Sequence, residues 1–183
     1  MAPAGQVTAS ALQAMLKDAA LTGSWTLDAS RSAIGLRSKS MWGLAPVKGT
    51  FREVTGNGTV ASDGQVSGTV TVAAASVDTK IAKRDTHLRS AGFFDSDNHP
   101  HITFRVEAIR PSRQGVTVTG ALTVRDRTRP VTFDATVSAS DPGEIRLDAE
   151  IQVNRADYGL TWSPMRMASM RNTITVHAVF TRS

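Results

Sequence analysis

Apolar and polar residues alternate along most of the chain from Ser24 to the C-terminus. In the clearest stretch, residues 66–74, Val, Gly and Ala occupy one face while Ser and Thr occupy the other. Strict alternation of this kind is typical of a β-strand with one buried and one solvated face. The same pattern predicts further strands at residues 25–27, 34–40, 47–51, 102–106, 116–124, 131–137, 145–153 and 174–180.

About eight consecutive, hairpin-linked strands are what an up-and-down antiparallel barrel requires, although a β-sandwich would show the same pattern. Small residues on the predicted buried faces leave volume inside, and eight strands can enclose one small ligand. Gly56-Asn57-Gly58 interrupts the pattern and predicts a turn or bulge with positive φ. The predicted fold class is therefore all-β, an antiparallel β-barrel of about eight strands with a cavity.

Two segments have helical rather than strand spacing. Residues 80–94 predict one helical insertion, which follows the capping pair Asp78-Thr79 and ends with the aromatic pair Phe93-Phe94, as a lid on a barrel would. A short N-terminal helix is predicted from the spacing of Leu12, Met15, Leu16 and Ala19. This second helix could pack over one barrel end, mediate pairing with another subunit, or remain peripheral and frayed.

Length and composition then set the broad class. A chain of 183 residues with 40% hydrophobic and 20% charged residues is typical of one soluble domain, which we assign to residues 24–183 with residues 1–23 as an extension. The absence of cysteine excludes disulfides and thiolate chemistry. No apolar run approaches the roughly 20 residues of a membrane span. Lys17-Asp18 interrupts the apolar residues near the start, so we expect a cytoplasmic protein without a secretory signal.

Several phrases of the sequence, in unbroken order, resemble the YceI-like family. They are WTLD (25–28), ASVDT (75–79), RDTHLRS (84–90), FFD (93–95), PHITF (100–104), GALTV (120–124), TRPV (128–131) and NRADYGL (154–160). The resemblance implies an extended, lipocalin-like barrel that encloses an isoprenoid-like chain or a related amphiphile, without catalysis and without a cofactor. The family often has a histidine near the position of Ser40 and a glycine where this chain has Asp126, a residue that tolerates the left-handed region.

The residues predicted to line the interior are apolar members of the strand faces and of the insertion, together with one histidine. They are Ile34, Leu36, Phe51, Val70, Val72, Phe93, Phe94, Phe104, Leu122, Phe133 and Trp162, with His87 as a contact for a polar head group. Ordinary core packing explains any one of the apolar residues, whereas the small residues facing them favour a tunnel for the set. Each buried methylene contributes about 0.8 kcal/mol, so a long chain can be held without any catalytic group.

An enzyme acting on a small amphiphile through Asp85 and His87 is the alternative function. Asp85 also lies four residues before Arg89, a spacing that predicts an ion pair on one helix face. A structural hydrogen bond is the plainer interpretation of His87. The sequence has no Gly-x-Ser-x-Gly motif and no phosphate-binding glycine loop.

Asp95, Asp97, His99 and His101 have the alternating spacing of metal ligands, but an Asp-Ser-Asp-Asn run next to a proline is more typical of a turn. We therefore predict no metal site.

Basic residues suggest partners. With a net charge of +5, acidic partners are favoured in a general way, although a solvated β-surface explains the same excess. Arg125, Arg127 and Arg129 at a predicted hairpin tip suit a diphosphate or an anionic membrane surface, and a solvated loop is the plainer interpretation. Arg155 and Asp157 predict an ion pair that shapes the following turn. Nucleic-acid binding is not predicted, because the phenylalanines alternate on the apolar face. The predicted partner is an isoprenoid-like lipid or fatty amphiphile; peripheral membrane contact and a homodimer stay open.

Overall fold

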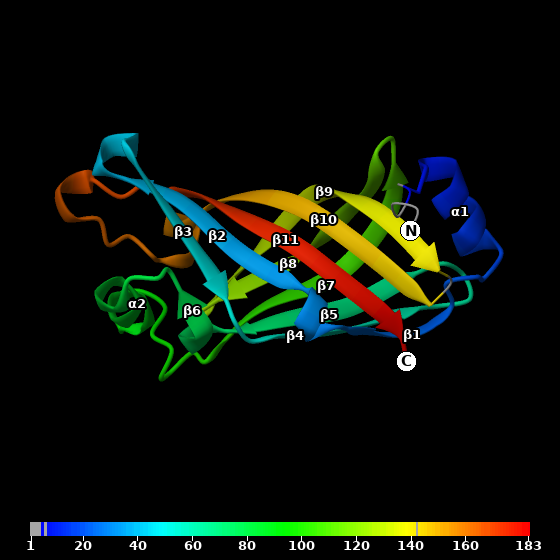
Figure 1. The fold of residues 1–183 in the computed structure, drawn as a ribbon, viewed down its shortest axis with the longest axis horizontal. Helices are drawn as coiled ribbons and strands as arrows, with labels where there is room; N and C mark the ends of the chain where they lie inside the picture. Colours follow the sequence, from blue (N-terminus) through cyan, green and yellow to red (C-terminus); the bar gives the residue numbers. More distant parts are fainter. Residues whose placement is uncertain (1–4, 6, 142) are drawn as a thin grey trace.

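The strands of the computed structural model, which describes residue 5, residues 7–141 and residues 143–183, form an elongated antiparallel barrel (Figure 1). In chain order the strands are β1 (Gly23–Leu27), β2 (Ala33–Ser40), β3 (Ala45–Phe51), β4 (Val54–Val60), β5 (Val66–Ala73), β6 (Val77–Asp78), β7 (His101–Ser112), β8 (Gly115–Val124), β9 (Arg127–Asp141), β10 (Glu144–Asn154) and β11 (Arg171–Arg182). The helix α1 (Ala9–Lys17) lies at one end of the barrel and α2 (Ala82–Arg89) lies at the other (Figure 1).

Eight strands close the barrel. The hydrogen-bonded order is β1-β4-β5-β7-β8-β9-β10-β11, and β11 returns to β1 through pairs such as Trp25 with Arg182. The remaining strands β2, β3 and β6 continue β1, β4 and β5 toward the α2 end, so that each pair forms one long strand broken at about the same level. The predicted all-β, lipocalin-like barrel of about eight strands with two helical segments is confirmed.

The predicted turn at Gly56-Asn57-Gly58 is wrong, because these residues form the regular middle of β4 and none has a positive φ. The inward-facing glycines instead permit close approach of neighbouring groups. A Cβ atom on Gly56 would lie 3.0 Å from Leu27 Cβ, and one on Gly68 in the paired strand β5 would lie 2.6 Å from the carbonyl oxygen of Asn57. Close packing, rather than a turn, therefore explains why these positions need glycine.

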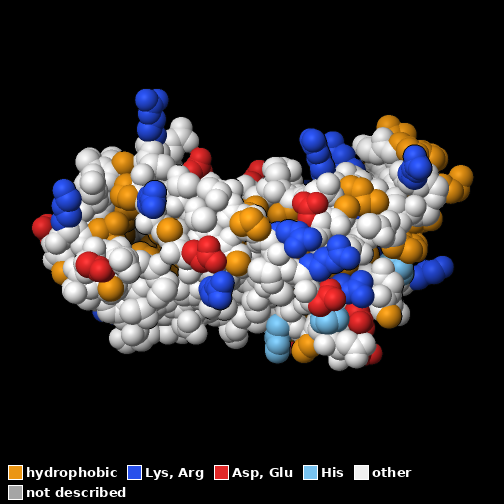
Figure 2. All heavy atoms as spheres, turned by 180° about the vertical axis from the view of Figure 1, so that it is seen from behind, with side chains coloured by type: hydrophobic (Ala, Val, Ile, Leu, Met, Phe, Trp, Pro, Cys, Tyr) orange, Lys and Arg blue, Asp and Glu red, His pale blue; other side chains and the backbone are white. Residues whose placement is uncertain are grey.

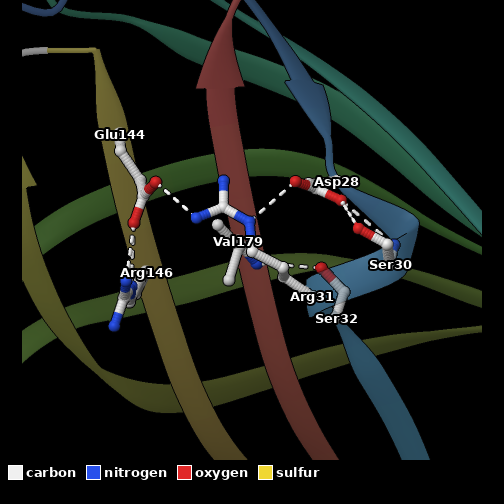
Figure 3. Close-up of polar contacts among 7 residues, drawn as sticks. All are labelled: Asp28, Ser30, Arg31, Ser32, Glu144, Arg146 and Val179. Carbon is white, nitrogen blue, oxygen red and sulfur yellow. Dashed lines mark hydrogen bonds and ion pairs between the residues drawn. The ribbon is translucent and has the colours of Figure 1, made fainter.

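A polar network holds the break between β1 and β2 (Figure 3). The Asp28 carboxylate accepts hydrogen bonds from Ser30 Oγ at 2.6 Å and from Arg31 Nε at 2.7 Å. The Arg31 guanidinium also reaches across β11 to the Glu144 carboxylate of β10, at 2.7 Å. The bond from Ser30 and then that from Arg31 lower the pKa of the Asp28 carboxyl from 3.8 to about 2. The break is thereby fixed to a strand two positions away in the barrel.

Buried hydrogen bonds fasten α2 to the strand that precedes it. The predicted cap at Asp78-Thr79 is wrong, since the helix begins after Ile81. The Asp85 carboxylate is buried and accepts hydrogen bonds from the backbone N–H of Thr79 at 2.9 Å and from its hydroxyl at 2.6 Å. Arg89 instead donates to the carbonyl oxygens of residues 75 and 77. The predicted Asp85–Arg89 ion pair is therefore wrong, because Asp85 binds Thr79 while Arg89 binds the backbone before it.

Apolar contacts dominate the attachment of α1. Thr8 caps the helix by accepting a hydrogen bond from the backbone N–H of Ala11 at 3.2 Å. Leu12 is only 5% exposed and packs with Leu21 and Trp25 in a core cluster at this end of the barrel. Within the described residues, neither helix has the length and apolar character needed to cross a lipid bilayer.

Candidate ligand-binding cavity

An apolar cavity of about 300 Å³ lies inside the barrel. Side chains from every barrel strand line it, and Leu12 from α1 and Phe94 from the segment after α2 lie at its two ends. Ten of the residues predicted from the sequence border this space. They are Ile34, Leu36, Phe51, Val70, Val72, Phe93, Phe94, Phe104, Leu122 and Phe133. The sequence pattern thus located residues of the inner wall.

Three large apolar side chains of the cavity wall lie between its two halves. Phe104, Leu147 and Phe180 pack against both core clusters, the one near α1 and the one near α2. The Phe104 ring lies directly over Gly120 of β8, where an added Cβ would come within 2.5 Å of the ring. Its centroid is 5.5 Å from that of Phe133. Any ligand that occupies both halves of the cavity must pass these side chains.

The aromatic pair after α2 fills the other end. Phe93 and Phe94 meet edge to face with ring centroids 4.8 Å apart, and Phe94 also lies 5.9 Å from Phe51 of β3. Backbone hydrogen bonds from Phe93 to Ser90 and from Phe94 to Leu88 hold the two residues against the end of the helix. Both rings are buried, so the insertion closes the barrel end as the sequence predicted.

Arg155 brings a positive charge to this apolar space. Its side chain borders the cavity and is only 6% exposed. The guanidinium donates to the carbonyl oxygens of Leu160 at 2.6 Å and Ser169 at 2.9 Å, and it lies 5.5 Å from the centre of the Phe93 ring. Burial lowers the pKa of this guanidinium below its usual value.

The predicted ion pair between Arg155 and Asp157 is wrong. In the described part of the chain Arg155 has backbone carbonyls but no carboxylate as partners, because its side chain points inward while Asp157 is exposed. The sequence signal that could have identified Arg155 was its place two residues after the inward-facing Val153 of β10, on the same face of the strand and within the NRADYGL phrase.

Two further polar side chains at this end were missed by the sequence analysis. Tyr158 and Asn172 are buried and border the cavity near Arg155. Burial raises the pKa of the Tyr158 hydroxyl, the charge of Asp157 raises it further, and Arg129 opposes both effects. The amide nitrogen of Asn172 donates to the carbonyl of Met170 at 3.1 Å. These three buried polar side chains of the cavity wall thus lie together at the α2 end.

His87 and Trp162, both predicted to face the interior, do not border the cavity. Their rings lie against each other with centroids 4.0 Å apart, and Trp162 is 48% exposed. His87 Nε2 is buried and has no hydrogen-bond partner in the described part of the chain. Since the Asp85 carboxylate binds Thr79, the structure does not assemble the Asp85–His87 pair that the enzyme alternative requires.

Asp95 organises the turn before β7. Its carboxylate accepts from the amide of Asn98 at 3.1 Å, and its carbonyl oxygen accepts from the backbone N–H of His99 at 2.8 Å. Across the part of the chain that the structure describes, no group of three or more His, Asp or Glu side chains is placed to hold a metal ion.

The arginines of the β8–β9 tip lie beside the turn that holds Tyr158. A Cβ atom on Gly159 would lie 3.3 Å from the Arg127 guanidinium. Arg125, with φ of 57°, takes the left-handed position of this hairpin, and Asp126 does not. The expectation that Asp126 replaces the family's glycine in the left-handed region is therefore wrong by one residue.

A comparison with known protein families matches the YceI-like domain to residues 25–181. The chain belongs to the YceI-like family. The matched residues begin at Trp25, so that α1 lies before the shared domain and α2 lies inside it.

Curated relatives agree with this assignment. A UPF0312 protein of Serratia proteamaculans is 34% identical over 128 residues, which cover 65% of this chain and 66% of that protein. Protein YceI of Escherichia coli is 35% identical over 95 residues, 51% of this chain and 50% of that protein. The chain therefore spans between half and two thirds of the length of these YceI-like relatives.

Solved structures show the same fold. BcnA of Burkholderia cenocepacia superposes with a TM-score of 0.74 at 22% identity, covering 84% of this chain and 98% of that one. A polyisoprenoid binding domain from Saccharophagus degradans, implicated in plant cell wall breakdown, gives a TM-score of 0.72 at 16% identity and covers 87% and 98%. At such identities the likeness establishes the shared YceI-like barrel.

Proposed function

We propose that this protein binds one elongated amphiphile with an isoprenoid-like tail inside its barrel and carries or stores it without chemical change. The observation that carries this proposal is the apolar cavity, which runs between two closed barrel ends and has one buried guanidinium, that of Arg155, at its α2 end. The Saccharophagus degradans domain of the same fold, which is described as polyisoprenoid binding, supports it.

The tail would occupy the apolar length of the cavity. Each methylene that leaves water contributes about 0.8 kcal/mol, so even a short prenyl chain gains several kcal/mol without a specific contact. A volume of about 300 Å³ lies at the lower end of the range of about 300–1,000 Å³ for ligand pockets. One slender chain therefore fits better than a bulky fused-ring lipid.

The head group would lie beside Arg155. A guanidinium has more N–H donors than its carbonyl partners here can use, and no carboxylate in the described residues neutralises its charge. A ligand oxygen that carries negative charge can supply both a hydrogen bond and this neutralisation, worth about 1.5–3 kcal/mol. The site therefore favours a prenyl phosphate over the corresponding alcohol by about tenfold or more.

Native mass spectrometry of delipidated protein tests the proposal. The protein is offered geranylgeranyl phosphate, geranylgeraniol and palmitate, and we expect one-to-one uptake with the phosphate bound most tightly. Failure to take up any of these amphiphiles would contradict lipid carriage, whereas equal binding of phosphate and alcohol would contradict the role of Arg155 alone. The mass of the bound ligand should stay unchanged on incubation, as a carrier requires.

A matched pair of alanine substitutions locates the ligand. Ala149→Phe places a ring inside the cavity from β10, while Ala121→Phe places the same ring on the outer face of β8. We expect the inner substitution to abolish uptake and the outer one to leave it unchanged. If Ala149→Phe folds and still takes up the lipid at parental affinity, the ligand does not occupy this cavity.

A further inference from the structure

Among the residues that the structure describes, the exposed large hydrophobic side chains all lie at the α2 end of the barrel. In the described part of the chain they are Met41 (53% exposed), Trp42 (66%), Leu44 (83%), Ile81 (48%), Trp162 (48%) and Met165 (77%). We call these six residues the apolar tip. Figure 2 shows hydrophobic side chains at the extremity of this half of the molecule, with Lys and Arg side chains next to them. Scattered single exposures would need no explanation, but their gathering at one end does.

Three separate segments build the apolar tip as one surface. The β2–β3 tip contacts the segment between η4 (Arg155–Tyr158) and β11 through hydrogen bonds from Trp42 N to Met167 O at 3.2 Å and from Ser169 N to Lys39 O at 2.8 Å. The third segment is residues 81–84, which are Ile81 and the start of α2, and the contact between the rings of His87 and Trp162, with centroids 4.0 Å apart, joins this helix to the second segment. These segments lie together at one end in Figure 1.

The backbone holds the tips in an unfavourable conformation. Met41, Trp42, Met165 and Arg166 have φ of 50°, 55°, 51° and 55°, in the left-handed region that residues with a bulky side chain rarely adopt. Strain of this kind persists where the surrounding structure imposes it, and it is found most often at functional sites. Here the strained backbone turns large apolar side chains outward both at the β2–β3 tip and in the segment before β11.

The three segments that carry the apolar tip contain basic residues and no acidic ones. Residues 38–48, 81–84 and 159–171 contain no Asp or Glu. Their basic residues are Lys39, Lys48, Lys83, Arg84, Arg166 and Arg171, and none pairs with a carboxylate in the described structure. Arg127 of the β8–β9 tip approaches the same surface at Gly159.

We propose that the apolar tip docks this end of the barrel on the surface of an anionic lipid bilayer. Tryptophan, leucine and methionine on loop tips can enter the interfacial region, where indole rings are preferred, while the surrounding Lys and Arg side chains contact anionic head groups. Because the segments that carry the apolar tip contain Lys and Arg but no Asp or Glu, their charge complements anionic lipid head groups. Docking at this end places the Arg155 side of the cavity next to the membrane.

Vesicle co-sedimentation tests the docking, with no lipid cargo required. We expect the protein to bind vesicles that contain phosphatidylglycerol, to bind phosphatidylcholine vesicles weakly, and to lose binding as salt concentration rises. The triple variant Trp42→Ser, Leu44→Ser and Met165→Ser should bind the anionic vesicles about tenfold or more weakly while its melting temperature stays close to the parental value. Parental binding by this variant would overturn the proposal.

Charge variants at the two ends provide a matched comparison. Lys39→Gln with Arg166→Gln removes two exposed, unpaired charges at the apolar tip. Arg110→Gln with Arg113→Gln removes two at the β7–β8 turn, at the α1 end. We expect several-fold weaker binding for the first pair only, since charges beyond about a Debye length from the membrane contribute little. Equal loss for both pairs would show nonspecific attraction and contradict docking at this end.

Tryptophan fluorescence gives an independent readout. Trp42 and Trp162 belong to the apolar tip, while Trp25 is buried with 4% exposure. In variants that retain only one of these tryptophans, brominated lipids should quench Trp42 and Trp162 but not Trp25. Absence of binding to anionic vesicles would overturn the proposal. A dimer that is lost in the triple serine variant would instead show that the apolar tip binds a second copy of this chain.

Discussion

The two ends of the barrel are closed by helices of about equal length in entirely different ways. At one end α1 inserts Leu12 into an apolar cluster, Thr8 caps the helix, and Arg182 donates to the carbonyl oxygens of residues 20 and 22 behind it. At the other end α2 is tied to β6 by the buried Asp85 and by Arg89, and the aromatic pair behind it fills the barrel. The first closure buries the helix through apolar contacts and places its polar bonds on the loop behind the helix, while the second ties the helix itself through directed polar bonds.

The α1 end mainly closes the barrel, whereas the α2 end also has the groups that could bind a ligand or a surface. The helix α1 precedes residues 25–181, which match the family, so one part of this barrel end lies outside the shared domain. The buried polar groups that border the cavity and the exposed apolar side chains of the β2–β3 tip, where Met41 and Trp42 have positive φ, occur at the α2 end. Specific chemistry therefore belongs to the α2 end, and the predictions below test the contrast.

The largest effect is expected for Phe94→Ala. Phe94 is 5% exposed and contacts the rings of Phe93 and Phe51, so its loss leaves a cavity in a region that polar bonds hold rigid. We expect the free energy of unfolding to fall by about 3–5 kcal/mol, measured by urea denaturation. Phe94→Leu serves as the control and should cost clearly less. A loss below about 1 kcal/mol would show that α2 is not a fixed part of the core.

A smaller loss is expected for Leu12→Ala at the opposite end. Because α1 is held by few directed contacts, it can shift to fill the space that the smaller side chain leaves. We expect about 2–3 kcal/mol, the lower part of the range for buried leucine. Hydrogen exchange should show faster exchange in α1 than in α2, for parent and variant alike. The reverse order of protection would break the comparison drawn here.

Removing the polar fastening of α2 is expected to cost less again. Asp85→Ala leaves the N–H and the hydroxyl of the buried Thr79 without their acceptor. The expected loss in unfolding free energy is about 1–3 kcal/mol. Asp97→Ala removes an exposed carboxylate of the same segment and is the matched control. Equal stability of the two variants would mean that Asp85 is not needed to hold the helix.

The smallest effect is expected between the two ends, at the break between β1 and β2. The pKa of Asp28 is lowered from 3.8 to about 2 by its bonds from Ser30 and Arg31, so its stabilising contribution is complete above pH 4 and disappears as the pH falls toward 2. Asp28→Asn should be less stable than the parent at neutral pH, and the two should converge near pH 2 in thermal melts. Asp126→Asn, an exposed control, should melt like the parent at every pH. If the difference in melting temperature between Asp28→Asn and the parent stays the same at every pH, the charge of the Asp28 carboxylate is not its cause.

The sequence predicted the inner wall well because side-chain period and packing agree there. Phe104, Leu122 and Phe133 face the cavity for the same reason that they alternate with threonine and arginine along their strands. Gly56-Asn57-Gly58 misled the analysis because glycine is typical of turns but also permits close packing within a strand. Local composition cannot distinguish these two uses.

The polar part of the candidate site could not be predicted from spacing. Arg155 and Asp157 lie two residues apart and suggested an ion pair, but the turn at Arg155–Tyr158 sends one side chain inward and the other to solvent. Trp162 was expected inside, as a scarce aromatic residue, and instead stacks on His87 at the surface. Both outcomes depend on contacts between irregular segments that are distant in the chain. The alternation of apolar and polar residues gives no information on such contacts.

The outer edge of β3 has a consequence for behaviour at high concentration. Beyond the short pairing with β6 at Thr50 and Phe51, residues Ala45–Gly49 pair only with β2 among the described strands. An open edge of this length invites a strand from a neighbouring molecule, but Pro46 withholds an N–H group and Lys48 adds an exposed charge. These two residues thus protect the molecule against strand-to-strand self-association, and valine at both positions should turn a monodisperse preparation into one that forms aggregates.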